Sequence, residues 1–171
     1  MDELSIENKK WFALYTKPRQ EFKAATELRD YYIEYFLPTI NVVKQWSDRK
    51  KKVEEPLFRG YVFIKADKTE RLQAVELKSI VKTIFFDGKP AVIPEWQIES
   101  MKKMLNSNAE IFLSDKLEIG TRIKVNEGPF AGVEGVVFNN DNNEQMLAVA
   151  IEMINRSVIV HLPSSDVAKV K

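Results

Sequence analysis

The sequence predicts an α+β protein in which an N-terminal domain, an antiparallel sheet with helices, precedes a small five-stranded β-barrel. Two observations lead to this prediction. Up to about residue 107, strand-like alternation and helical spacing follow each other in the order β-α-β-β-α-β-α, close to a split βαβ unit. From Leu117 onward, five short alternating segments are separated by turn signals, which is typical of a small barrel. The expected boundaries are 1–107 for the first domain, 108–116 for a linker and 117–171 for the barrel.

Composition limits the classes of protein to which the chain can belong. Its 171 residues include 26 basic and 25 acidic side chains, so the formal net charge is only +1. This balance argues against an autonomous nucleic-acid binder, and such a role has to come from local patches. The absence of cysteine excludes disulfides and thiolate metal sites and fits a reducing compartment. With no signal peptide and no apolar run of membrane length, we expect a cytoplasmic monomer.

The first strand and helix are predicted from Trp11–Thr16 and the residues that follow. WFALYT alternates as a strand, and Lys17-Pro18 predicts a helix start, because proline suits the first helical position. The helix is expected to run to about Tyr32. Its predicted buried stripe, at helical spacing, is Phe22, Ala25, Leu28 and Tyr32.

The segment Glu54–Lys65, EEPLFRGYVFIK, predicts a central strand with two apolar faces. Small antiparallel sheets usually expose one face to water, so a strand with aromatics on both faces needs a cover for the second. We interpret this cover as another macromolecule, since aromatic side chains are common anchors of interfaces. The alternative is that both faces are core, covered by the third helix or the second domain. The partner face is expected to carry Trp11, Tyr15, Tyr61, Phe63, Ile84 and Phe86, and the helix-packed face Phe12, Leu14, Phe58, Val62, Ile64, Val81 and Phe85.

A protruding arm, KQWSDRKKKVEE, is expected between a strand at Ile33–Val43 and a strand at Pro56–Ala66. Its basic run, Arg49–Lys52, has two interpretations. The commoner one is a solvated hairpin tip, and the alternative is an arm that reaches phosphates.

The remaining elements follow from local signals. Asp67–Lys78 predicts a short amphipathic helix, and Asp87-Gly88 between apolar runs predicts a tight hairpin turn. Pro94 is expected to start a third helix with the stripe Ile98, Met101 and Leu105. Within the barrel, Glu144–Ile154 contains strong helix formers, but we predict a strand because GPFAGVEG and SVIVHL on either side are typical of a barrel.

The sequence contains no set of residues typical of a catalytic site, a metal site or a phosphate-binding loop. The single histidine, His161, lies in an alternating strand, which favours a structural or solvent-facing role. Gly128, Gly132 and Gly135 lack the following Lys-Ser/Thr of a phosphate loop and are interpreted as turn glycines. We therefore expect no enzyme activity, no cofactor and no metal.

A basic edge is predicted beside the apolar partner face. Helix N-termini and cationic side chains bind phosphates, although a solvated helix face has the same composition. The residues of this edge are Lys17, Arg19, Gln20, Lys23 and Lys78.

Taken together, these segments resemble a known family. WFALYTKPRQE, EPLFRGYVFI and IFFDGKPAVIP resemble, in order and spacing, the N-terminal (NGN) domain of NusG-like transcription elongation factors. GTRIKVNEGPFAGVEGVV and INRSVIVHL resemble their C-terminal KOW domain. The similarity runs from Trp11 to Lys171. It leans toward specialised antiterminators of the RfaH and UpxY types, because EPLF precedes the central strand and Arg59-Gly60 stands where the general factor usually has Pro-Gly.

The resemblance implies a function in which the protein binds other macromolecules and catalyses no reaction. The NGN domain would bind the clamp of the largest RNA polymerase subunit and suppress pausing or termination, on specific operons such as those for capsule-like polysaccharides. It implies polymerase contacts by Tyr15, Phe63 and Phe86, with Tyr61 as neighbour, and contacts to the non-template DNA strand or leader nucleic acid by the basic edge. Ile154, Asn155 and Arg156 match the KOW loop that meets ribosomal protein S10 or Rho.

Two alternatives accompany this interpretation. One is a KOW-containing ribosomal or RNA-binding structural protein, which the near-neutral charge disfavours because such proteins make many phosphate contacts. The other concerns conformation, since RfaH-type KOW segments can form a helical hairpin in place of the barrel.

Overall fold

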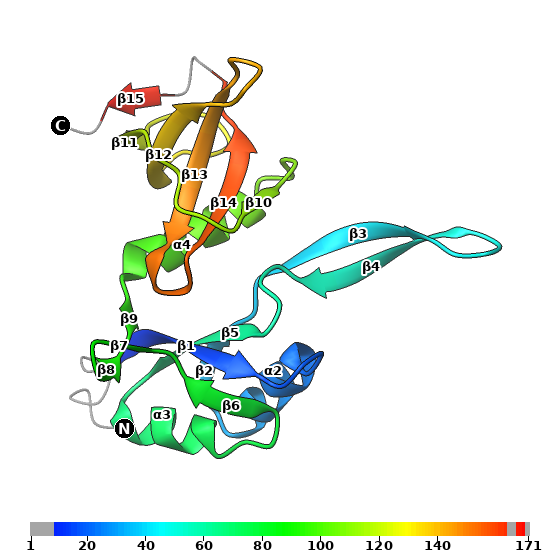
Figure 1. Ribbon diagram of the computed structural model, residues 1–171, viewed down its shortest axis with the longest axis vertical. Helices are drawn as coiled ribbons and strands as arrows, with labels where there is room; N and C mark the ends of the chain where they lie inside the picture. The colour runs from blue at the N-terminus through cyan, green and yellow to red at the C-terminus, as the bar shows by residue number, and fades with distance from the viewer. Residues whose placement is uncertain (1–8, 164–166, 170–171) are drawn as a thin grey trace. The chain divides into compact units, whose positions relative to one another are not determined.

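The computed structural model describes residues 9–163 and 167–169. The chain forms two compact units, Met1–Val92 and Ile93–Lys171 (Figure 1). This division comes earlier than the expected boundary after residue 107. The reason is the helix α4 (Glu95–Leu105), which contacts β12 and β13 of the second unit. Helices and antiparallel sheets are present as the predicted α+β class requires.

The first unit is built on an antiparallel sheet with the strand order β2-β5-β1-β6, and β9 also pairs with β1. The register between β1 and β5 places Leu14 opposite Val62 and Tyr15 opposite Tyr61. Because successive residues of a strand point to opposite faces, this register confirms which residues of the two central strands share a face. The prediction that Trp11 lies open to a partner is wrong, because its side chain is 2% exposed. The strands are β1 (Lys10–Thr16), β2 (Glu34–Phe36), β5 (Tyr61–Ala66), β6 (Ile80–Thr83) and β9 (Val92–Ile93).

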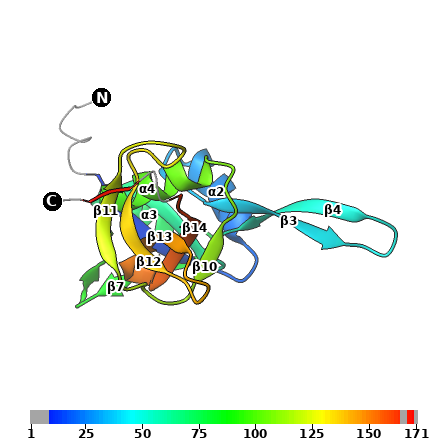
Figure 2. The ribbon, with the colours of Figure 1, turned by 90° about the horizontal axis from the view of Figure 1, so that it is seen from above.

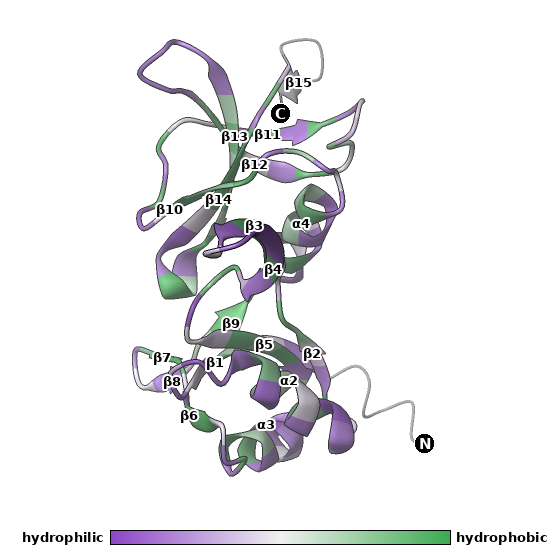
Figure 3. Cartoon of the chain, turned by 90° about the vertical axis from the view of Figure 1, so that its right-hand side faces the viewer, coloured by the Kyte–Doolittle hydropathy of each residue, from purple (hydrophilic) through white to green (hydrophobic). Residues whose placement is uncertain are grey.

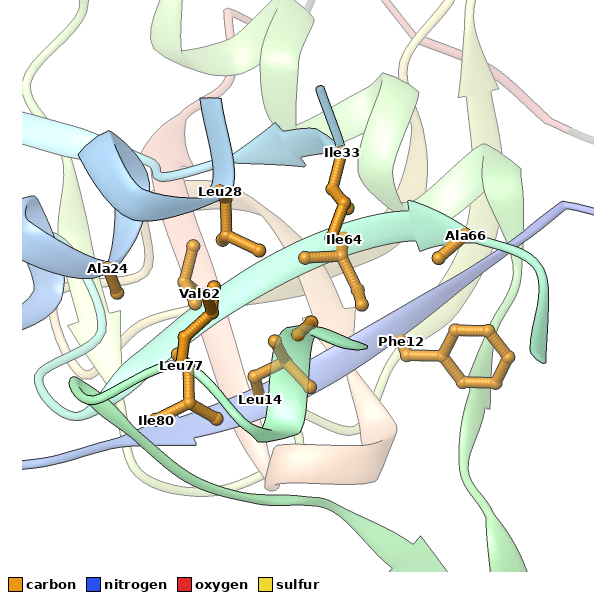
Figure 4. Close-up of a cluster of buried hydrophobic side chains, with 11 residues drawn as sticks. Phe12, Leu14, Ala24, Leu28, Ile33, Val62, Ile64, Ala66, Leu77 and Ile80 are labelled. Carbon is orange, nitrogen blue, oxygen red and sulfur yellow. The ribbon is translucent and has the colours of Figure 1, made fainter. Parts of the chain in front are cut away.

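Helices α2 (Glu21–Asp30) and α3 (Lys68–Val75) cover one face of this sheet. Figure 4 shows their apolar side chains meeting those of β1 and β5 in one cluster. A capping box starts α3: the Asp67 carboxylate accepts from the backbone N–H of Glu70, and the Glu70 carboxylate accepts from that of Asp67. The buried cluster consists of Phe12, Leu14, Ala24, Leu28, Ile33, Val62, Ile64, Ala66, Ala74, Leu77 and Ile80.

The start and the buried stripe of α2 differ from the prediction. Lys17–Gln20 forms a turn closed by a hydrogen bond from the Gln20 N–H to the Lys17 carbonyl (3.1 Å), so Pro18 precedes the helix. Phe22 is 44% exposed and Tyr32 is 93% exposed, and neither belongs to the core. Tyr32 has a φ of 57° and lies beyond the helix end, which removes it from the helical stripe. The side chains that α2 buries are Glu21, Ala24, Ala25 and Leu28.

Strands β3 (Thr39–Gln45) and β4 (Lys50–Pro56) form a two-stranded sheet of their own, which we call the arm. Figures 1 and 2 show it reaching away from the main sheet of the same unit. The predicted strand Pro56–Ala66 is interrupted, because β4 ends at Pro56 and a turn at Leu57–Gly60 precedes β5. At the base of the arm, Glu55 forms ion pairs with Lys44 and Arg59.

A small hairpin follows β6 and consists of β7 (Phe85–Phe86) and β8 (Lys89–Pro90). Its turn residues Asp87 and Gly88 have φ angles of 51° and 72°, which confirms the predicted tight turn with two positive φ angles. Val81 and Phe85 are exposed, so the prediction that they pack against the helices is wrong. The chain leaves the sheet after Thr83, and the core no longer lies beside Phe85.

The second unit contains an antiparallel sheet with the strand order β10-β14-β13-β12-β11-β15. Six strands are present in the described residues where five were expected, because β10 lies inside the predicted linker and pairs with β14. Strand β13 covers most of the segment rich in helix formers, so the predicted strand is confirmed there. The strands are β10 (Phe112–Ser114), β11 (Thr121–Val125), β12 (Glu134–Asn139), β13 (Gln145–Ile151), β14 (Arg156–His161) and β15 (Val167–Lys169).

Helix α4 is fixed to the second unit by apolar, polar and cation–π contacts. It begins after Pro94 and buries Ile98, Met101 and Met104, so the stripe was predicted correctly except at Leu105. The Ser100 hydroxyl accepts a hydrogen bond from the Glu134 N–H (3.1 Å). The Arg122 guanidinium lies 4.6 Å from the centre of the Trp96 ring, a favourable cation–π distance.

The observed orientation of α2 predicts different losses of stability for two substitutions on this helix. We expect Leu28→Ala to lower the free energy of unfolding by about 2–5 kcal/mol, because it leaves a cavity in a closed core. Phe22→Ala is expected to cost less than about 1 kcal/mol, as is usual for surface positions. Urea denaturation of the full chain, followed by circular dichroism, measures both. An equal loss for the two variants would contradict the observed orientation of α2.

The arm base predicts a pH effect. The hydrogen bond from Lys44 lowers the pKa of the Glu55 carboxyl below 4.5, the charges of Lys44 and Arg59 act in the same direction, and desolvation opposes them. This pair therefore stabilises the fold above pH 4.5, and its contribution is lost as pH falls through the folded-state pKa. We expect Lys44→Gln to raise the Glu55 pKa, measured by carboxyl carbon NMR, while Lys52→Gln leaves it unchanged.

Candidate functional site

Tyr15 and Tyr61 are the accessible side chains that β1 and β5 contribute to the predicted partner face. The register places them directly opposite each other on β1 and β5, and their rings meet edge to face with centroids 5.6 Å apart. Tyr15 is 40% exposed, and Tyr61 is partly exposed. The pair presents two phenol groups and two ring edges on the face opposite the helix-packed core, which is the chemistry of an interface anchor.

Phe63 was expected to be exposed beside this pair, and the structure places it in the interior. Its side chain is 0% exposed and packs against the rings of Phe36 and Phe58, at centroid distances of 6.3 and 6.0 Å. Phe58 was assigned to the opposite face. The turn before β5, in which the Tyr61 N–H donates to the Phe58 carbonyl, breaks the alternation of the strand and brings Phe58 to Phe63.

Phe86 is 68% exposed at the end of β7, beside the tight turn of the small hairpin. Backbone hydrogen bonds from the Ile84 N–H to the Ala13 carbonyl and from the Ala91 N–H to the Ile84 carbonyl, each 2.9 Å, attach the base of this hairpin to β1. Within the described residues, no ring contact joins Phe86 to the tyrosine pair. The partner face thus contains a tyrosine pair and a separate exposed phenylalanine.

The predicted basic edge is brought together by the backbone. The Lys17 N–H donates to the Ser79 carbonyl (2.8 Å), so the turn before α2 lies against the loop that carries Lys78. Lys17, Arg19, Lys23 and Lys78 are exposed, and Gln20 is half-buried at the N-cap of α2. Arg19 has a φ of 60°, as the third position of a type II turn requires. The edge therefore presents four cations from two segments.

Two carboxylates that the sequence patterns did not single out organise this edge. Glu21 is 5% exposed and accepts a hydrogen bond from the Gly60 N–H (2.8 Å). Glu27 accepts from both the N–H and the hydroxyl of Ser79. Because Glu21 places a negative charge in the first turn of α2, the helix N-terminus is not an open anion site. Phosphate binding at this edge would depend on the side-chain cations.

The predicted loop of the second unit has one buried and two accessible members. Ile154 is buried, whereas Asn155 is exposed with a φ of 53°. The Asn155 amide donates to the Asp115 carbonyl (3.1 Å), and Arg156 Nε lies 3.3 Å from the Asp115 carboxylate. The loop is thus held to the segment after β10, with Asn155 and the edge of Arg156 available to a partner.

The described residues give little support for a metal site, a catalytic histidine or a membrane span. Across 9–163 and 167–169, no group of three or more His, Cys, Asp or Glu side chains is placed to hold a metal. His161 packs edge to face on Phe112, with ring centroids 5.6 Å apart. Within the same residues no helix has the length and apolar character needed to cross a membrane.

The chain is similar in sequence to known proteins. Residues 9–102 match the family model described as transcription termination factor nusG. The transcription termination/antitermination protein NusG of Haemophilus influenzae is 26% identical over 183 residues, covering 99% of this chain and 98% of that protein. Its counterpart from Escherichia coli K12 is 27% identical, with coverage of 94% and 96%.

A solved structure supports the fold. NusG of Thermotoga maritima, solved in work on its domain interaction, aligns with a TM-score of 0.50 and 19% identity, over 97% of this chain and 99% of that one. The names of these relatives describe transcription termination and antitermination proteins. The chain belongs to the NusG family of transcription termination and antitermination factors.

Proposed function

We propose that this protein binds RNA polymerase through Tyr15, Tyr61 and Phe86 and suppresses pausing or termination in the bacterial cytoplasm. The observation that carries the proposal is the edge-to-face tyrosine pair, partly exposed on the sheet face opposite the helices. Aromatic side chains bury large areas at a low cost in side-chain entropy, so such a pair is suited to anchor a partner. The family resemblance supports the clamp of the largest polymerase subunit as the partner surface.

Binding alone would account for the activity. A factor that binds the active conformation of polymerase more tightly than the paused one shifts the population toward the active state. A difference of 1.4 kcal/mol in binding free energy changes the ratio of the two states about tenfold. No residue of the factor has to perform chemistry. In this proposal Phe63 has an indirect role: its buried ring supports the strand that carries Tyr61.

The basic edge is proposed to contact the non-template DNA strand or leader nucleic acid. Lys17, Arg19 and Lys23 are exposed near the start of α2, and Lys78 is exposed on the adjoining loop. Such a set of cations suits the backbone of a single strand, since phosphate contacts position a protein without reading sequence. Gln20 is half-buried and offers a side-chain amide to a base.

In the second unit we propose that Asn155 and Arg156 contact a protein partner, ribosomal protein S10 or Rho, and that buried Ile154 supports their loop. The first unit would thus be the polymerase-binding NGN part and the second the KOW part. Arg59 is 86% exposed at the arm base, at the position where the sequence resembles specialised antiterminators. We infer from this resemblance a role on a limited set of operons, of the capsule-polysaccharide kind.

Substitution of the tyrosine pair tests the polymerase contact. We expect Tyr15→Ala and Tyr61→Ala each to weaken retention of purified RNA polymerase at least tenfold and to slow pause escape in vitro. Tyr31→Ala, which removes an exposed tyrosine at the end of α2, is the matched control and should retain full activity. Unchanged retention by both tyrosine variants, with the fold intact by circular dichroism, would refute the contact.

The basic edge predicts a separable defect. We expect the double substitution of Lys17 and Lys78 by Gln to reduce crosslinking to the non-template strand of an elongation complex several-fold, while retention of polymerase changes less than twofold. Removal of two phosphate contacts should also lower the salt dependence of the strand contact. Lys116→Gln combined with Lys124→Gln removes two exposed cations of the second unit and serves as the control. Equal crosslinking by both double variants would contradict this assignment.

A further inference from the structure

The outer half of the arm, Lys44–Lys52, has a local positive charge that the net charge of the whole chain does not reveal. The nine residues Lys44–Lys52 contain five basic side chains and one acidic side chain, which is a net charge of +4. The rest of the chain holds 21 of the 26 basic and 24 of the 25 acidic residues and is therefore net negative. Figure 3 shows the hydrophilic colour of β3 and β4. The outer half of the arm is thus cationic, whereas the rest of the chain is slightly acidic.

The cations of the arm lie on both faces of the ribbon. The register places Lys50 opposite Gln45 and Lys52 opposite Val43 on one face, and Lys51 opposite Lys44 on the other. Within the described chain, Arg49, Lys50 and Lys52 form no ion pair, and all three are exposed. Like charges directly opposite each other destabilise a strand pair. A two-stranded hairpin is marginal by itself, so this charge weakens the element that carries it.

We propose that the arm binds duplex DNA by entering the major groove. A two-stranded ribbon fits this groove, which is about 12 Å wide and has phosphates along both walls. The two faces of the ribbon meet the two walls, and both faces carry cations. With strands of seven residues, the arm is about 20 Å long.

The aromatic side chain of the arm favours duplex over single-stranded DNA. Single-strand binders stack bases on open aromatic faces. Trp46 is the aromatic residue of this segment, and the Lys51 ammonium lies 4.7 Å from its ring centre. One ring face is therefore covered, which leaves less aromatic area for base stacking, and Trp46 is 45% exposed in total. The interaction uses none of the proposed polymerase-binding residues and does not depend on that proposal.

Fluorescence anisotropy of the full-length protein with a labelled 30-base-pair duplex, without polymerase, tests the proposal. If Arg49, Lys50, Lys51 and Lys52 each neutralise one phosphate, affinity should fall about 150-fold between 50 and 200 mM salt. The triple variant Arg49→Gln, Lys50→Gln, Lys52→Gln should retain one contact, and its affinity should fall only about 3-fold over this range. Single-stranded DNA and duplex RNA of the same length are expected to bind more weakly than duplex DNA.

A matched triple variant controls for net charge. Lys68→Gln, Lys116→Gln and Lys124→Gln remove three exposed cations outside the arm and should preserve the salt dependence of the natural protein. Equal losses in the two triple variants would overturn the proposal, as would equal affinity for single-stranded DNA. If the arm variant bound DNA normally but lost retention of polymerase, the arm would be a protein contact and the proposal would fail. Backbone NMR shifts of Thr39–Pro56 check that the arm remains folded in each variant.

Discussion

Gly60 is the point on which the arrangement of the first unit depends. Its carbonyl accepts from the Thr16 N–H of β1 (2.8 Å), and its N–H donates to the Glu21 carboxylate of α2 (2.8 Å). Its φ of 85° favours glycine, and an added Cβ would lie 3.1 Å from the Tyr15 ring. One residue without a side chain therefore links the first strand, the first helix and the central strand. It also leaves the space in which the tyrosine pair is seated.

In the first unit, two carboxylates near the basic edge are held by hydrogen bonds within the protein. Glu21 and Glu27 both lie on α2 among the cations of the basic edge, and a uniform mixture would cancel the local field. Each carboxylate is instead used by the backbone, Glu21 by Gly60 and Glu27 by Ser79. These hydrogen bonds keep each carboxylate in place. The cations remain outside, so a chain with a net charge of +1 presents a basic surface there.

The predictions from sequence were correct where the alternation within one strand, or the residues of one turn, determine the local structure. The alternation along Trp11–Thr16 and Tyr61–Ala66 separated the two sheet faces correctly, because the pleat fixes side-chain direction residue by residue. The turn at Asp87-Gly88 was also predicted correctly, because these two residues readily adopt the positive φ angles that the turn requires. Pro18 was misplaced because proline suits both the first helical position and the second position of a turn. Phe58 was misplaced because the turn at Gly60 resets the alternation, and the burial of Phe63 depends on Phe36, which is distant in sequence.

Helix α4 shows a further limit of sequence, since its apolar stripe was predicted but not the strands that it covers. Met101 and Met104 are buried, and the helix contacts β12 and β13. This assignment matters for dissecting the protein. A fragment cut at the polar Asn106–Asn108 stretch would separate the barrel strands from their helix and expose the apolar surface that α4 covers. A fragment that begins near Ile93 keeps this layer, so the place to divide the chain is set by packing and not by the most loop-like sequence.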